Sequence, residues 1–498
     1  MTIEHVDVLI VGAGLSGIGA GAHLKQYSPD RSFAILEGRE AIGGTWDLFR
    51  YPGIRSDSDM YTLGYSFRPW TSPKAIADGS SILRYIQDTA NEEDLTRHIR
   101  LSHRVKRASW STRDARWTVE IERGPHREPV TMTCLFYFGC SGYYNYDQGY
   151  TPDFPDLAKF KGRVVHPQHW PADLDYANQK VVVIGSGATA VTLVPSMADK
   201  AAHVTMLQRS PTYVMALPGE DVIANGLRRL LPAKLAYSIT RCKNVGLAMF
   251  FFNMSKRRPE AVKKAIIGGV RRALGPDFNV GKHFTPSYKP WDQRVCIVPD
   301  GDLFKSIRKG RASVVTDHIE RFTEHGIKLR SGQELNADVI VTATGLDLVA
   351  MGGVELLIDG KPVAMSQTMS YKGMMLSNVP NLAYVVGYTN ASWTLKGDLT
   401  CQYVCRLLNH MRDSGLTQCM PVNDPSVKQE NWIDFTSGYI QRSIDKFPKQ
   451  GDKKPWKLHQ NYAFDIMTLR FAQIVDGTMT FSNPEPNWPL DQASASTR

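Results

Sequence analysis

The sequence predicts an α/β fold built from two similar βαβ units joined by short connecting segments. Two glycine-rich turns, GAGLSG at Gly12–Gly17 and GSGATA at Gly185–Ala190, each directly follow an apolar stretch. A basic and aromatic stretch, residues 216–290, interrupts the βα rhythm after the second turn. A glycine-rich turn between a buried strand and a helix is typical of a Rossmann-like unit that binds a dinucleotide. We therefore expect two dinucleotide-binding domains, discontinuous in sequence, with a helical insertion in the second.

The first unit begins close to the N-terminus. Val6–Val11 is a near-continuous apolar run, as expected of a strand that is covered on both faces. The glycine turn lets backbone amides approach a pyrophosphate at the start of the helix predicted for Ile18–Tyr27. Phe33–Leu36 is the next predicted strand, and it ends in Glu37, where a carboxylate can hold an unphosphorylated ribose. The expected ligand is FAD or NAD, bound by Gly12, Gly14, Gly17 and Glu37.

A loop with a dense pattern, GGTWDLFRYPGIRSD at Gly43–Asp57, comes next. Two glycines and a Tyr-Pro-Gly turn exclude a regular element, so we predict an ordered loop that returns over the cofactor. Its candidate cofactor residues are Gly44, Thr45, Trp46 and Asp57. A small β-meander is predicted around Arg104-Val105 and Trp117–Ile121, where Val105 is a further candidate, and Leu135–Gly142 is predicted as a closing strand.

The second unit repeats the pattern with one change of charge. A strand is predicted at Lys180–Ile184 and a helix from Ala188, and the next strand, His203–Leu207, is followed by Arg209 and Ser210. Arg209 therefore stands where the first unit has an acid. A guanidinium at this place suits a ribose 2′-phosphate, which favours NADPH here and leaves FAD for the first unit. The candidate NADPH residues of this unit are Gly185, Gly187, Thr189, Ala190, Arg209 and Ser210.

After the insertion the chain resumes the second unit, and it then crosses back to the first. Val295–Val298 and Ser313–Val315 are predicted strands. Asp338–Gly345 is a predicted strand that ends in Ala-Thr-Gly, where Thr344 and Gly345 are further candidate NADP-binding residues. After a strand at Leu382–Gly387, we expect a loop at Tyr388–Leu399 and a helix around Gln402–Met411. We predict an FAD-binding domain in two parts, residues 1–145 and residues 343–498, the latter including the C-terminal tail. Residues 146–178 form the hinge. The NADP-binding domain comprises residues 179–215 and 291–342, with its insertion at residues 216–290.

Composition and motif content exclude several other classes. With 42% hydrophobic and 22% charged residues the chain is expected to be soluble and globular. No secretory pattern begins the sequence, and the longest apolar run, Val245–Phe252, is too short to span a bilayer, so we expect a cytoplasmic protein. Seven cysteines without a C-x-x-C pair are expected to be reduced core thiols. No metal-ligand spacing and no nucleic-acid-binding module are visible.

Phe160–Pro171, FKGRVVHPQHWP, lies between the two glycine turns. As F-x-G-x-x-x-H-x-x-x-W-P it resembles the signature of Baeyer–Villiger monooxygenases, which are class B flavin monooxygenases. The loop Gly43–Asp57 also matches a fingerprint of that family, G-G-x-W-x-x-x-x-Y-P-G-x-x-x-D. Tail segments Ser437–Gly451 and Pro455–Tyr462 look like the branch of ethionamide-activating monooxygenases. Cys140–Tyr144 departs from the Ala-Thr-Gly-like turn of many members. The matching signature residues are Phe160, Gly162, His166, Trp170 and Pro171.

The resemblance implies an NADPH- and O2-dependent enzyme that inserts oxygen beside a ketone carbonyl, through a flavin peroxide, to give an ester or lactone. Sulfoxidation of thioethers is implied as a secondary activity. It also implies that Arg294 is the fixed cation near the flavin, since arginine keeps its proton, and that Asp57 holds its guanidinium. His166 is expected to act in the hinge and not as a general base. Three alternatives stay open: a flavin N- or S-oxygenase without ketone chemistry, a non-oxygenating NADPH-flavin reductase, and a redox sensor.

The insertion concentrates the positive charge of the chain. Leu227–Lys282 holds 13 Lys and Arg against two acids, while the whole chain has a net charge of +10. In Ala261–Leu274, apolar residues recur at helical spacing opposite Lys263, Lys264, Arg271 and Arg272. We expect a helical cover over the substrate entrance. Its apolar stripe either packs on the NADP domain or makes a weak peripheral contact with an anionic membrane.

Overall fold

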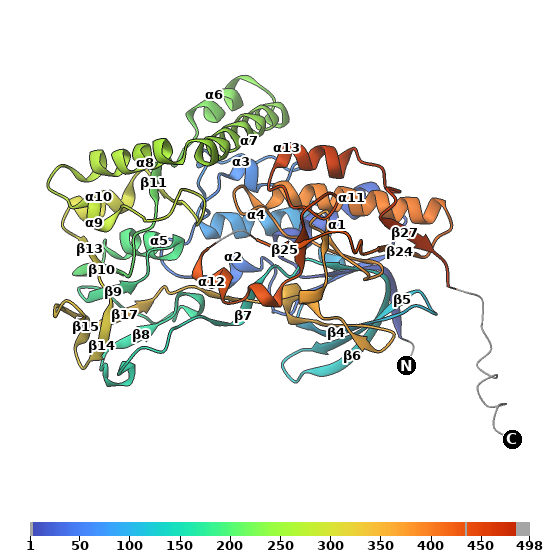
Figure 1. Cartoon of the computed structure of the whole chain (residues 1–498), viewed down its shortest axis with the longest axis horizontal. Coiled ribbons are helices and arrows are strands. Elements are labelled where there is room, and N and C mark those ends of the chain that lie inside the picture. Colours follow the sequence, from blue (N-terminus) through green and yellow to red (C-terminus); the bar gives the residue numbers. More distant parts are fainter. Residues whose placement is uncertain (1–2, 434–435, 485–498) are drawn as a thin grey trace.

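The computed structural model describes residues 3–433 and 436–484, and it confirms the predicted α/β fold with two separate sheets (Figure 1). The first sheet has nine strands. In spatial order they are β20 (Lys361–Pro362), β19 (Glu355–Ile358), β4 (His103–Ser111), β5 (Arg116–Arg123), β6 (Glu128–Gly139), β1 (Glu4–Val11), β2 (Phe33–Leu36) and β3 (Ile99–Arg100), with β23 (Leu382–Tyr384) also on β6. The predicted meander is thus an antiparallel part of the same sheet.

Strand β1 lies at the centre of this sheet, parallel to both β2 and β6. Val8 and Ile10 face one core, which contains α1 (Leu15–Tyr27), α4 (Gly79–Glu92) and α11 (Trp393–Asp413). Leu9 and Val11 face a second core, to which β4 and β5 contribute. Burial on both faces explains why β1 has a continuous apolar run instead of an alternating one.

The second sheet is parallel throughout, in the order β13 (Ala312–Thr316), β10 (His203–Gln208), β9 (Lys180–Ile184), β17 (Val339–Thr342) and β8 (Arg163–Val165). Strand β8 comes from the segment that we predicted only as a hinge. Its three residues pair with β17 through their backbone, and a pairing of this kind leaves no side-chain pattern in the sequence. A three-stranded antiparallel sheet, β14 (Ile319–Thr323), β15 (Gly326–Leu329) and β16 (Glu334–Asn336), was also not predicted.

Two local predictions were wrong. Helix α11 begins at Trp393, so the loop that we expected up to Leu399 ends earlier. Trp393, Thr394 and Gly397 have low helix propensity, but the packing of this first turn against the protein outweighs that low propensity. The loop Gly43–Asp57 contains one helical turn, α2 (Thr45–Leu48), although we excluded regular structure there. Asp47 in that turn favours the positive end of the helix dipole. Cys242 is exposed, whereas the other six cysteines are buried thiols as expected.

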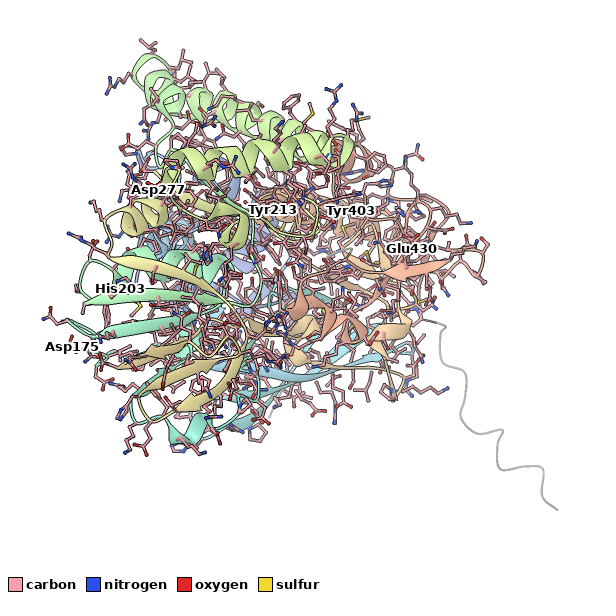
Figure 2. The ribbon with its side chains drawn as sticks, turned by 60° about the vertical axis from the view of Figure 1, so that its left-hand side comes forward. Asp175, His203, Tyr213, Asp277, Tyr403 and Glu430 are labelled. Atoms are coloured by element: carbon pink, nitrogen blue, oxygen red, sulfur yellow. The ribbon has the colours of Figure 1, made fainter. Side chains whose placement is uncertain are left out.

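The insertion consists of helices carried by a two-stranded ribbon. The ribbon pairs β11 (Val214–Leu217) with β12 (Cys296–Pro299), and between them lie α6 (Val222–Leu230), α7 (Ala233–Arg257), α8 (Pro259–Leu274) and α9 (Val280–His283). The apolar stripe of α8 faces inward: Val262 and Ile266 pack with Tyr213, which lies beneath the helices in Figure 2. Val270 and Leu274 join the core of the second domain. The lipid-facing interpretation of this helix is therefore wrong.

A buried arginine fixes α7 to the first domain. Arg241 is 8% exposed, and its Nη1 donates to the carbonyl oxygens of Tyr61 (2.9 Å) and Gly64 (2.7 Å). Its Nη2 lies 3.4 Å from the carboxylate of Asp398, on α11. A charge-assisted network of this kind holds the insertion in one position over α3 (Met60–Leu63) and α11.

The two connections between the domains run side by side. Strand β7 (Tyr144–Gly149) pairs antiparallel with β18 (Leu346–Leu348). The hinge histidine secures this crossing, because His166 Nδ1 accepts from the Gln168 amide (3.2 Å), which leaves Nε2 protonated to donate to the Gly345 carbonyl (3.2 Å). A Cβ atom on Gly149 would lie 2.0 Å from the imidazole ring, so the ring is held against the backbone.

We predict that His166 makes stability depend on pH. Burial lowers the pKa of His166 in the folded protein. As pH falls below about 6.5, the histidine of the unfolded chain therefore binds a proton before that of the folded chain does. The stabilisation that the neutral ring gives above that pH is lost as pH falls toward the lowered pKa. The loss should be less than about 1 kcal/mol, since the ring is only partly buried. Denaturant unfolding at about pH 8 and about pH 5.5 should show a larger loss for the wild type than for His166→Gln. Equal losses would mean that the hinge does not depend on the neutral ring.

Candidate active site

A cavity of about 580 Å³ lies along the first glycine turn. Its walls include most of the residues predicted to hold the flavin nucleotide: Gly12, Gly14, Glu37, Gly44, Thr45, Trp46 and Val105. Gly17 lies beneath it in the first turn of α1, where a Cβ atom would be 1.8 Å from the Gly12 carbonyl. Asp57 is not among its walls. The structure thus gathers seven of the nine predicted residues around one elongated space.

Glu37 closes the end of β2 at this cavity. Its carboxylate accepts the amide of Ala13 (2.9 Å) and that of Arg39 (3.0 Å), and burial raises its pKa. A carboxylate has four lone-pair positions, so two remain for a hydroxyl ligand. The residue type and its place both fit a ribose.

The Gly-Gly loop packs closely on the first glycine turn. Gly43 N donates to the Ala13 carbonyl (3.0 Å), and a Cβ on Gly44, at φ +56°, would lie 3.1 Å from Gly14 Cα. Tyr146 lies on the other side of Gly44, and its hydroxyl is 3.2 Å from Thr45 Oγ1. This close approach leaves bare backbone facing the cavity, as a bound pyrophosphate needs.

Arg294 lies where three cavities meet. Among the described residues, Arg294 is the one that lines all three cavities. They are the cavity at the first glycine turn, a larger cavity of about 770 Å³, and a small cavity beside Tyr143 and Trp393. Its Nη1 donates to Asp57 Oδ2 at 2.6 Å, and Asp57 raises the pKa of the guanidinium well above its usual value. Buried Nε has no partner among the described residues. A permanent cation thus lies where the cavities join.

The surroundings of Arg294 contain tyrosines that we did not predict. Tyr143 and Tyr439 line the small cavity with it, and Tyr144 lies beside Tyr143, with ring centroids 4.7 Å apart. Burial raises the pKa of Tyr144 and of Tyr439 to about 12, so both stay neutral near pH 7. The sequence signal that could have revealed Tyr143 and Tyr144 is their position directly after a buried strand, in the segment where the chain departs from the family pattern.

The loop that carries Asp57 is anchored on the other domain. Phe49 and Tyr51 belong to the core of the second domain. Gly53, at φ +74°, lies against α5 (Ala188–Met197), where a Cβ would be 1.8 Å from Ser196 Oγ. Asp57 and Arg294 therefore meet because a loop of the first domain is packed into the second.

The second glycine turn also brings its predicted residues together. Gly187 caps α5, Ala190 is buried, and Thr189 bonds to Tyr51. Ser186 Oγ lies 2.8 Å from Thr212 Oγ1 and 3.3 Å from the Ser210 carbonyl, which ties the turn that contains Gly185 to the end of β10. Arg209 is exposed there, and no ion pair engages it in residues 3–433 and 436–484. An unpaired guanidinium beside a helix N-terminus fits a phosphate.

The remaining predicted residues lie at the crossing between the domains. Thr344 Oγ1 donates to the Tyr150 carbonyl (2.6 Å), and the Gly345 carbonyl accepts from His166. Phe160 is buried, and Trp170 packs partly buried on the core of the second domain. Gly162 directly precedes β8, and Pro171 follows the short turn Pro167–His169. The signature therefore holds the hinge together and does not line the three cavities that meet at Arg294.

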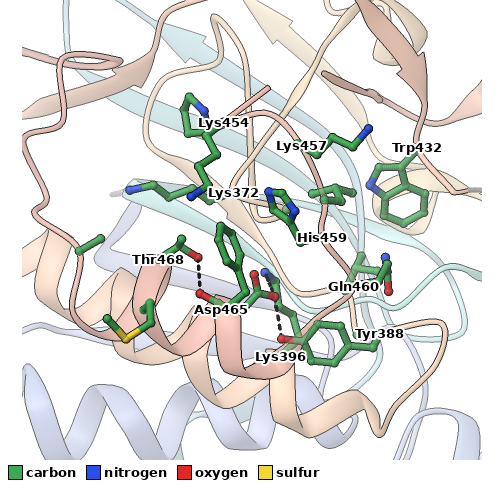
Figure 3. A pocket seen from close by; sticks show the side chains of 18 of the residues that line it. Lys372, Tyr388, Lys396, Trp432, Lys454, Lys457, His459, Gln460, Asp465 and Thr468 are labelled. Carbon is green, nitrogen blue, oxygen red and sulfur yellow. Dashed lines mark hydrogen bonds and ion pairs between the residues drawn. The ribbon is translucent and has the colours of Figure 1, made fainter. Parts of the chain in front are cut away.

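A separate pocket of about 260 Å³ lies under the C-terminal segment (Figure 3). Lys396 pairs with Asp465 (2.8 Å), which also accepts from Tyr388. Lys372 pairs with Asp476 (3.0 Å) in a similar way. Both acids come from the C-terminal segment, residues 462–484, whereas Lys396 belongs to α11 and Lys372 lies before that helix. These ion pairs anchor that segment, so we do not assign catalysis to this pocket.

Within the described ranges there is no group of His, Cys, Asp and Glu residues that could hold a metal ion. The same ranges contain no helix that is long and apolar enough to cross a bilayer.

Comparison with known proteins agrees with this geometry. Residues 69–382 match the model of the flavin-binding monooxygenase-like family, and residues 10–74 match an NAD(P)-binding Rossmann-like domain. The FAD-containing monooxygenase EthA of Mycobacterium tuberculosis is 54% identical over 97% of this chain and 99% of its own. Two solved structures, an NADP-bound oxidised steroid monooxygenase and a cyclohexanone monooxygenase, share the fold with TM-scores of 0.75. They are 20% and 19% identical and cover 96% of this chain and 99% and 100% of their own.

A family model that spans more than half of the chain and a relative that is similar over almost its full length lead to the same assignment. The predicted flavin cofactor and monooxygenase class are confirmed. The chain belongs to the flavin-binding monooxygenase-like family.

Proposed function

We propose that this protein is a Baeyer–Villiger monooxygenase that holds FAD in the cavity at the first glycine turn and NADPH at the second. The reaction is ketone + NADPH + H⁺ + O2 to ester or lactone + NADP⁺ + water. The observation that carries the proposal is the place of Arg294, at the meeting point of the cofactor cavity and the larger apolar cavity. Dependence on NADPH fits a cytoplasmic location.

The flavin supplies the oxygen-transfer chemistry when bound, and the chain supplies position and charge. Arg294 offers a permanent positive charge in a partly enclosed site, where a cation stabilises developing negative charge without losing a proton. Asp57 restrains that guanidinium from one side. The neutral hydroxyls of Tyr144 and Tyr439 add no competing charge nearby.

The larger cavity is the proposed ketone site. Met215, Phe251, Trp291 and Leu395 are among the side chains that line it, together with Arg294, Asp57 and the polar side chains of Asn390 and Ser392. The lining also includes the charged residues Asp59, Glu220, Asp221 and Lys243. A mainly apolar space with some polar groups suits a small organic substrate with one carbonyl. The cyclohexanone monooxygenase of the same fold is consistent with such a substrate.

A flavin N- or S-oxygenase without ketone chemistry is the nearest alternative, because the name of EthA specifies only a monooxygenase. The hinge signature ending in Trp170-Pro171 favours the ketone reaction. We also propose sulfoxidation of thioethers as a secondary activity. A disulfide reductase is disfavoured, because the chain has no C-x-x-C pair.

The proposal is tested by incubating the FAD-loaded enzyme with NADPH and ¹⁸O2, and with either 2-octanone or a thioether. We expect an ester that carries one labelled oxygen atom and consumption of one NADPH per ester. A labelled sulfoxide without any ester would identify the N- or S-oxygenase. NADPH oxidation without a labelled organic product would identify a reductase or sensor.

We predict that Arg294→Ala abolishes ester formation while FAD binding and NADPH oxidation persist. The substitution removes the cation that faces the joined cavities but leaves the glycine turns intact. Asp57→Ala should reduce ester formation less, because the guanidinium remains. Product yield, flavin content and melting temperature are the measurements.

Arg55→Ala is the matched control for this prediction. Arg55 is close to Asp57 in sequence and forms an ion pair with Asp302 at 2.5 Å, but it lines none of the three cavities. It should keep the ester yield even if stability drops. An Arg294→Ala enzyme with normal ester yield would show that the catalytic cation is another residue.

We predict that Arg209→Ala removes the preference for NADPH over NADH. Loss of a charge-assisted bond costs about 1.5–3 kcal/mol, which corresponds to a roughly ten- to hundredfold higher apparent KM for NADPH. The KM for NADH should hardly change, because NADH lacks the 2′-phosphate. Unchanged KM values for both nucleotides would mean that the phosphate binds elsewhere.

A further inference from the structure

Helices α6 and α7 present an unusual number of apolar side chains to solvent. They form the top edge of the molecule in Figure 1. Leu230 is 83% exposed and Phe250 64%, values that are rare for such large apolar residues. The exposed large apolar residues of this face are Val222, Ile223, Leu230, Leu235, Ile239, Leu247 and Phe250. We call these seven residues the α6–α7 face.

On α7 three of these residues share one side of the helix. Leu235, Ile239 and Phe250 lie on the side opposite to buried Tyr237 and the anchoring Arg241. The helix therefore has one side fixed in the protein and an apolar side turned outward. Helix α8 differs, because its apolar stripe is buried.

The charge around the face is mostly positive, although Glu220, just before α6, is an exposed acid. From Val222 to Arg258 the sequence contains eight Lys and Arg and no acid. Arg241 is buried, and Lys243 is paired with Asp221 of the preceding turn. Arg229, Lys234 and Arg257 are exposed close to the apolar residues. An apolar helix face bordered by exposed cations is the pattern that binds an anionic lipid surface.

The face is continuous with the proposed ketone cavity. Four of its residues, Val222, Ile223, Leu247 and Phe250, also line the cavity of about 770 Å³. The same cavity includes Arg294 and Asp57. One cavity therefore extends from the exposed helices to the proposed catalytic cation.

We propose that the α6–α7 face docks on an anionic membrane surface and that the cavity takes up apolar molecules dissolved in that membrane. Lipid is favoured over a second copy of this chain because the border is predominantly basic, and two such faces would repel each other. The docking itself does not depend on the catalytic proposal. The uptake of substrate rests on the proposed function.

Docking is tested by co-sedimentation of the FAD-loaded enzyme with vesicles of phosphatidylglycerol or of phosphatidylcholine. We expect binding to phosphatidylglycerol that weakens with salt, since added ions screen the charges. The triple variant Leu230→Ser, Leu235→Ser, Ile239→Ser should bind at least about tenfold more weakly. None of these three side chains lines the cavity, so turnover of 2-octanone in buffer should remain.

Two control variants separate this face from general charge and general exposure. Phe471→Ser removes an apolar side chain that is 66% exposed on the C-terminal segment, and it should not change binding. Replacing Lys263, Lys264, Arg271 and Arg272 of α8 with glutamine should weaken vesicle binding less than the triple variant does. Melting temperatures should stay within a few degrees of the wild type for all three.

Two results would overturn the docking proposal. One is no sedimentation of the wild type with phosphatidylglycerol at low salt. The other is equal binding of the wild type and the triple variant. If the triple variant instead converts an oligomer to a monomer in analytical ultracentrifugation while vesicle binding is absent, the face is an interface between copies.

Uptake is tested separately with a long-chain methyl ketone dissolved in phosphatidylglycerol vesicles. The triple variant should lose most of its rate with this substrate and keep its rate with 2-octanone in buffer. Equal loss with both substrates, or loss with neither, would reject uptake from the membrane. Absence of any ester in the wild type would refute the proposed function instead, and the sedimentation result would still stand.

Discussion

The ion pair between Arg294 and Asp57 is the interaction on which the arrangement of the site depends. The two residues come from different domains, and their 2.6 Å contact lies beside the cavities that meet at Arg294. A charge in a partly enclosed site is costly unless a counter-charge is fixed beside it. Asp57 can be fixed only if its loop is in place, and that loop is anchored by Tyr51 in the core of the second domain and by Gly53 against α5. The geometry of one cation therefore depends on how the two domains are packed.

The crossing between the domains supports the same geometry. Strands β7 and β18 pair with each other, and His166 bonds to the turn at Gly345 where the chain returns. Arg241 fixes the helical insertion to α11, whose first residue, Trp393, lines the cofactor cavity. By contrast, Arg209 stands exposed at the end of β10. The proposed flavin site is thus tightly interlocked, whereas the proposed NADPH site is open at the phosphate end.

Much of the fold could be predicted from the sequence, because buried parallel strands and glycine turns leave strong local patterns. Phe33–Leu36 and Lys180–Ile184 have the predicted bounds, and most of the predicted flavin-site residues line one cavity. The predictions failed where distant contacts decide. Strand β8 exists only through its pairing with β17, the start of α11 is stabilised by burial, and Tyr439 joins the site from a distant segment. The periodicity of apolar residues predicted the stripe of α8, but it could not show whether that stripe contacts a protein core or lipid. The stripe is buried in the protein, and the exposed apolar side chains lie on α6 and α7.

The central claim is that the cavities joined at Arg294 serve one reaction, in which reduced flavin, O2 and a ketone meet. The most direct measurement is rapid mixing of the NADPH-reduced enzyme with oxygenated buffer, with NADP⁺ bound and the flavin absorbance followed in time. We expect a long-lived absorbance, distinct from both oxidised and reduced flavin, that decays faster when ketone is added and yields ester. A direct return to oxidised flavin with release of hydrogen peroxide, at a rate that ketone does not change, would contradict the account.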